Sequence, residues 1–109
     1  MPKDERAYLG NMLDTARKAV EILGTKNRKE FDGDETLVIA LTHLVQNLGE
    51  AARRVSPEYQ KDHAEIPWNK IIGMRHKVVH DYLDVNPDIV WHVVKAELPS
   101  LISALEKII

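Results

Sequence analysis

Apolar residues recur at helical spacing along most of this sequence. Between Asp4 and Leu23 they return every three to four positions, and the same spacing is found between Asp34 and Arg54. It is found again from Pro67 to about Tyr82 or Leu83, and in a last stretch that starts at Asn86 and reaches Leu105. No window shows the strict alternation of a half-buried strand. The pattern predicts an all-α fold with four long helices.

Capping residues and prolines mark the joints between these stretches. Asp34 is suited to cap the second long helix, since its side chain can accept hydrogen bonds from the free amides of the first turn. Ser56-Pro57-Glu58 predicts the start of one short extra helix, with serine at the cap and proline in the first turn. Asn86-Pro87-Asp88 predicts the start of the last helix by the same logic, and Pro67 opens the one before it.

The connections between the predicted helices are short, which favours an antiparallel arrangement of consecutive helices. We therefore expect residues 1–109 to form one domain, an up-and-down four-helix bundle with one extra short helix. The polar stretch from Gly24 to Gly33 is interpreted as a loop. Pro99 lies inside the last helix and is expected to kink it, because proline removes a backbone donor and crowds the preceding turn.

Composition excludes several classes of protein. The 109 residues include no cysteine, which removes disulfides, thiolate metal sites and cysteine nucleophiles, and fits a reducing cytoplasm. The longest apolar run, from Leu37 to Leu41, is too short to span a bilayer, and the N-terminus is too charged for a signal peptide. With a net charge of -2, any action on RNA or DNA must come from a local site.

Arg75 is the unusual residue of the fourth long helix. On a helical wheel it falls in the middle of the apolar stripe, between Ile71 and Val79. A guanidinium cannot lose its proton, so its burial requires partners. Either Arg75 is paired within the core, or it points into a cleft where an anion binds.

Two histidines and a tyrosine follow Arg75. His76 and His80 are four positions apart, a spacing that suits two metal ligands, but a third ligand would be needed and the glutamate of the zincin motif is absent. The alternative is a pair of histidines at the rim of the helix with no metal. Tyr82 is one heptad after Arg75, which fits a core tyrosine with its hydroxyl at the rim.

An arginine and a histidine can together cleave RNA without a metal. The histidine moves a proton to or from a ribose or phosphate oxygen, and the arginine stabilises the charge on the transition state. On one helix Arg75 and His80 would be about 140° apart. Either the long arginine bridges that gap, or two copies of the helix line a shared cleft across a two-fold axis.

The motif Arg75-x4-His80-x-Tyr82 resembles that of the HepT-type branch of the HEPN-domain ribonucleases. The resemblance runs from about Leu9 to Leu105. It includes further short sequence motifs that occur in the same order along the chain: Gly49-Glu50-Ala51, Ile66-Pro67-Trp68, Ile71-Ile72-Gly73-Met74-Arg75, Val78-Val79-His80-Asp81-Tyr82, Asp88-Ile89-Val90-Trp91 and Leu98-Pro99.

This resemblance implies a homodimeric toxin that is a metal-independent endoribonuclease without a cofactor, with Arg75 and His80 as its catalytic pair. It also implies an antitoxin, a minimal nucleotidyltransferase, that silences the toxin by transferring AMP to Tyr82. The position of His76 is frequently Asn in the family. His76 would either assist proton transfer or position Arg75. The competing hypothesis is a non-catalytic helical partner that presents a regulatory tyrosine to a nucleotidyltransferase.

Several side chains outside the motif can be interpreted in more than one way. Glu50 falls opposite the main apolar stripe of its helix, on a face that is either solvated, a dimer surface, or the place of a partner for Arg75. Trp68 and Trp91 are expected to be packing anchors rather than platforms for bases. Four cations are either solvated or form a phosphate-steering patch: Arg53, Arg54, Lys70 and Lys77.

Overall fold

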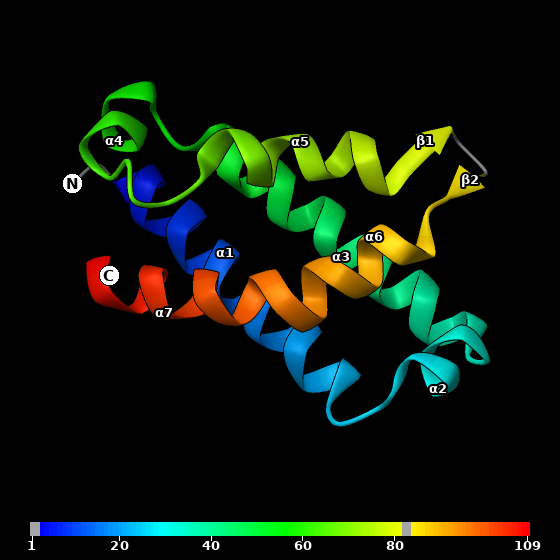
Figure 1. The fold of residues 1–109 in the computed structure, drawn as a ribbon. Coiled ribbons are helices and arrows are strands. Elements are labelled where there is room, and N and C mark those ends of the chain that lie inside the picture. The colour runs from blue at the N-terminus through cyan, green and yellow to red at the C-terminus, as the bar shows by residue number, and fades with distance from the viewer. Residues whose placement is uncertain (1–2, 82–83) are drawn as a thin grey trace.

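The computed structural model describes the backbone of residues 3–81 and 84–109 and the side chains of residues 5–74 and 86–109. Its long helices are α1 (Lys3–Leu23), α3 (Glu35–Arg54), α5 (Trp68–Val78) and a C-terminal helical segment. Helix α3 packs against both α1 and α5, and the C-terminal segment packs back on α1 (Figure 1). The predicted all-α bundle is confirmed.

The core consists of the apolar stripes that the sequence pattern identified. Leu41, Val45 and Leu48 of α3 are fully buried, and they belong to one apolar cluster with Met12 and Ala16 of α1. Among the described residues, none of the helices is both long and apolar enough to cross a membrane.

The predicted helix starts are confirmed by their hydrogen bonds. The Asp34 carboxylate accepts from the amide of Leu37 at 3.0 Å. The Ser56 hydroxyl accepts from the amide of Tyr59 at 3.2 Å and caps the short helix α4 (Pro57–Asp62). The Asn86 side chain accepts from the amides of Asp88 and Ile89, with Pro87 in the first turn. Each cap satisfies a donor that the helix itself leaves free.

The segment interpreted as a loop contains a short helix, α2 (Arg28–Asp32), so that interpretation is wrong in part. Asn27 and Glu30 form a capping box, in which each side chain accepts from the backbone amide of the other at 2.8 and 3.0 Å. Phe31 is fully buried and fixes α2 to the core. Gly24, with a φ of 57°, turns the chain out of α1 in a conformation that favours glycine.

The fourth long helix ends earlier than predicted. We expected it to reach Tyr82 or Leu83 and expected no strands, but α5 ends at Val78. The chain continues as β1 (Val79–Asp81), which pairs antiparallel with β2 (Asp84–Val85). Two features favour this ending: valines at 78 and 79 suit extended backbone, and Asn86 before Pro87 is held extended.

The C-terminal segment is continuous but not uniform. It begins as α6 (Pro87–His92), passes through a π-helical turn, η1 (Val93–Glu97), and ends as α7 (Leu98–Ile108). The amide of Leu98 donates to the carbonyl of Val93, five residues back. The disturbance that we predicted at Pro99 takes the form of this wider turn directly before it. Pro99 then lies in the first turn of α7, where its missing donor is tolerated.

Candidate functional site

The motif residues lie where α5 gives way to the two strands. Arg75 and His76 are in the last turn of α5, and His80 is in β1. Tyr82 and the side chains of Arg75, His76, Lys77 and His80 lie outside the described residues. Their roles therefore stay predictions.

The end of α5 at Val78 changes the geometry expected of the motif. His80 is not on the helix that carries Arg75, so the expected separation of about 140° around one helix is wrong. The same ending removes the helical i, i+4 relation between His76 and His80 on which the metal hypothesis depended. Among the described side chains, no group of three or more His, Asp or Glu is placed to hold a metal ion.

The motif segment, residues 75–82, is joined at both ends to well-packed helices. On the N-terminal side, Ile71 and Met74 of α5 are buried in the core. On the C-terminal side, Asn86 caps α6, whose Val90 is fully buried. The hairpin and α2 lie at the same end of the molecule, away from the two termini (Figure 1).

Helix α2 is fastened to α6 by charge and by aromatic packing. The guanidinium of Arg28 donates a hydrogen bond to the carboxylate of Asp32 at 2.8 Å and another to the carboxylate of Asp88 in α6 at 2.5 Å. These hydrogen bonds raise the pKa of Arg28 still further, so the contact keeps its positive partner at every physiological pH. The Phe31 and Trp91 rings have centroids 5.3 Å apart, which confirms Trp91 as a packing residue.

Trp68 is also a packing residue, as predicted. It is 5% exposed, and its indole N–H donates to the carbonyl of His63 at 2.9 Å. Its ring meets the Tyr59 ring edge-on at 6.4 Å. The Tyr59 hydroxyl is buried and, among the described residues, has no hydrogen-bond partner. Burial, and secondarily the charges of Glu5 and Glu65, raise the pKa of Tyr59.

Glu50 pairs with two arginines of its own helix, each within one turn of it. Its carboxylate bonds Arg53 at 2.6 Å and is 3.4 Å from the Nε of Arg54. Together with Asn11 and Asn47 it lines a polar hollow of about 250 Å³ between α1 and α3. These contacts place Arg53 and Arg54 beside a carboxylate. The pairing of Glu50 with Arg75 stays a prediction, since the Arg75 side chain is outside the described residues.

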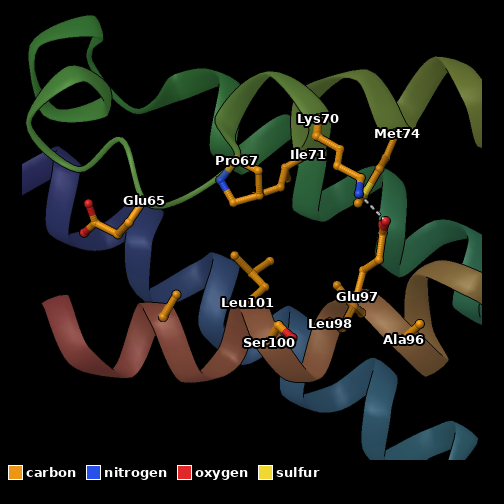
Figure 2. A pocket seen from close by; sticks show the side chains of 11 residues that line it. Glu65, Pro67, Lys70, Ile71, Met74, Ala96, Glu97, Leu98, Ser100 and Leu101 are labelled. Carbon is orange, nitrogen blue, oxygen red and sulfur yellow. Dashed lines mark ion pairs between the residues drawn. The ribbon is translucent and has the colours of Figure 1, made fainter.

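Lys70 was grouped with Arg53 and Arg54 as a candidate for a phosphate-steering patch, but it lies in a different environment. It forms an ion pair with Glu97 of η1 across a hollow between α5 and the C-terminal segment (Figure 2). The imidazole Nε2 of His92 is 3.5 Å from the same Glu97 oxygen. Sequence reasoning did not identify Glu97, because its partners are distant along the chain and nothing local distinguishes it from a solvated glutamate.

The chain is similar to proteins with ribonuclease names over nearly its whole length. A family model described as Ribonuclease HepT-like matches residues 12–108. A relative named as a putative RNase, from Caldanaerobacter subterraneus subsp. tengcongensis, is 30% identical over 107 residues, covering 98% of this chain and 96% of the relative. The "Probable ribonuclease HepT" of Thermococcus cleftensis is 29% identical over 108 residues, covering 99% and 98%. No solved structure matches the chain.

Proposed function

The chain belongs to the HepT-like ribonuclease family, and from this premise we propose that it is a metal-independent endoribonuclease whose catalytic pair is Arg75 and His80. The observation that carries the proposal is that the motif Arg75-x4-His80-x-Tyr82 falls within the matched residues 12–108. The matched relatives are named as ribonucleases, which supports the same reaction.

The reaction is an attack of the ribose on its own phosphodiester. The 2′-oxygen forms a bond to phosphorus and the bond to the 5′-oxygen breaks, which leaves a 2′,3′-cyclic phosphate and a 5′-hydroxyl. His80 takes the proton from the 2′-hydroxyl or gives one to the leaving 5′-oxygen. Arg75 stabilises the charge that builds on the phosphate oxygens. His76 either assists the proton transfer or positions Arg75.

We propose that the active form is a homodimer, in which two motif segments line one cleft. Because α5 ends at Val78, Arg75 and His80 are carried by different elements, so a partner copy can complete the site without a shared helix face. An interface substitution that leaves the fold intact but produces monomers should then abolish cleavage. Full activity in such a monomer would contradict the shared cleft.

We further propose that a minimal nucleotidyltransferase antitoxin silences the enzyme at Tyr82. The Tyr82 phenol oxygen would attack the α-phosphate of ATP, and pyrophosphate would leave. The added phosphodiester would carry negative charge and bulk to the cleft, where it would occupy the anion site of Arg75. Protein modified in this way should gain the mass of AMP on Tyr82 and lose cleavage.

Cleavage of single-stranded RNA in the presence of a chelator tests the enzymatic proposal. The wild type should release products ending in a 2′,3′-cyclic phosphate, and His80→Ala should lower the rate by about 10²–10⁴, the usual value of one positioned proton transfer. His43→Ala is the matched control, since His43 is an exposed histidine of α3. If wild type and His80→Ala behave alike, the chain is a binding module that presents Tyr82 to the nucleotidyltransferase.

A further inference from the structure

A third hollow adjoins the last turn of α5, which carries Arg75. It has a volume of about 340 Å³ and lies where α5, α6 and η1 meet. Its apolar wall comes from Met74, Ile89 and Val93. Its polar rim consists of Lys70, Asp88, His92 and Glu97. Met74 directly precedes Arg75, and Ile89 follows the end of β2 by four positions. The hollow is therefore bounded by the two helices that lead into and out of the motif.

The rim has two carboxylates, and they differ in their partners. Asp88 is paired with Arg28 of α2, whereas Glu97 is the one that the rim's own cations approach. Lys70 and His92 both approach the Oε1 atom of Glu97. Among the described residues, Oε2 of Glu97 has no ion-pair or hydrogen-bond partner. The Glu97 side chain is only 19% exposed, whereas Lys70 is 55% exposed. Figure 2 shows the two side chains reaching toward each other from facing elements. The rim thus offers carboxylate acceptors beside an ammonium donor.

We propose that this hollow binds a guanine base of the RNA substrate and gives the enzyme a preference for cleavage beside guanine. The inference rests on the proposed ribonuclease function. The apolar wall would receive the face of the base, as apolar side chains do in pockets for flat ligands. Glu97 would accept from N1–H and from the exocyclic amine, and Lys70 would donate to O6.

The arrangement of donors and acceptors selects guanine over the other bases. The Watson–Crick edge of guanine has two adjacent donors beside one acceptor, which matches a carboxylate beside an ammonium. Adenine and cytosine each present a single donor group next to an acceptor, and uracil has one donor between two acceptors. Each of these would leave a Glu97 oxygen facing a base acceptor, which is costly in a partly buried site. Glu97 is therefore the residue that would determine specificity.

Nucleotide binding to the full-length wild-type protein tests the pocket without requiring cleavage. The four 5′-monophosphates are titrated separately while backbone amide resonances are followed by NMR. GMP should shift the amides of Met74, Val93 and Glu97, and should bind roughly 5- to 150-fold more tightly than AMP, CMP or UMP, the range expected of a bidentate base contact. Equal affinity for all four, or tighter binding of AMP than GMP, would overturn the proposal.

Substitution of Glu97 tests the role of its charge. Glu97→Gln replaces one acceptor oxygen by a donor, so the preference for GMP, and for cleavage beside guanine, should fall to within about twofold of the other bases. Glu106→Gln is the matched control, because Glu106 is also paired with a basic side chain, that of Arg17, but lies outside the hollow. It should retain the preference. Circular dichroism and thermal unfolding check that both variants are folded.

The outcomes separate the two proposals. If the wild type cleaves RNA and Glu97→Gln cleaves with an unchanged base preference, the guanine pocket is refuted while the ribonuclease function stands. If the wild type binds GMP selectively through Glu97 but does not cleave RNA, the ribonuclease function is refuted while the guanine pocket stands.

Discussion

Glu5 connects the beginning of α1 to the beginning of α4, and its removal should be costly. The carboxylate is 5% exposed. Its two oxygens accept from the amide and the hydroxyl of Ser56, at 2.7 and 2.9 Å. The same hydroxyl accepts from the amide of Tyr59 and caps α4. One carboxylate thus satisfies two donors on a residue fifty-one positions away.

The expected magnitude follows from what Glu5→Ala leaves behind. A hydrogen bond to a charged group contributes about 1.5–3 kcal/mol, and a buried donor without a partner costs about 1–3 kcal/mol. The Ser56 hydroxyl can rotate to another partner, but its amide cannot. We therefore expect Glu5→Ala to lower the free energy of unfolding by about 2–3 kcal/mol, or roughly 10–20 °C in Tm for a domain of this size. Glu5→Gln, which keeps one acceptor oxygen, should lose about half of this.

Urea unfolding followed by circular dichroism measures the effect. Glu21→Ala is the matched control, because Glu21 is an exposed glutamate of the same helix. The double variant with Ser56→Ala should lose less than the sum of the two single variants, since the residues share their hydrogen bonds. A loss below about 0.5 kcal/mol for Glu5→Ala, or strict additivity in the double variant, would refute the reasoning.

Two further stability predictions follow from buried aromatic side chains. Phe31→Ala should cost about 3–5 kcal/mol in the free energy of unfolding, because the ring is fully buried against Trp91; a loss below about 1 kcal/mol in urea unfolding would show that α2 is not fixed by this residue. The folded protein raises the pKa of Tyr59. The contribution of this residue to the free energy of unfolding should therefore be full below about pH 10, the usual pKa of tyrosine, and should be lost as the pH rises through the pKa of Tyr59 in the folded protein. Tyr59→Phe should remove that part of the alkaline decline, so equal declines in wild type and variant between about pH 8 and about pH 11 would contradict the assignment.

The helix boundaries that could be predicted are those written in a few neighbouring residues. Asp34, Ser56-Pro57 and Asn86-Pro87 carry their own capping chemistry, so their helices begin where the sequence indicates. The burial of α3 also follows from local spacing, because one face of a helix repeats every three to four residues.

The parts that could not be predicted depend on distant contacts or on patterns too short to show a period. Helix α2 has only five residues, and the signal that could have found it was the Asn27-x-x-Glu30 capping box. The early end of α5 depended on competition between helical spacing and the extended preference of Val79. For the candidate site, the position of Glu97 beside Lys70 comes from the packing of α5 against the C-terminal segment, which no local pattern encodes.

The attachment of α2 to α6 makes the short stretch after α1 a remote support for the motif. A change at Arg28 or Phe31 would remove a contact that positions α6. It would thereby affect the chain segment that leads into α6 and carries His80, although some fifty positions separate His80 from Arg28. The ionic half of this attachment weakens as salt is added, whereas the aromatic half does not. A substitution in this stretch can therefore change the geometry of the motif while every motif residue is kept.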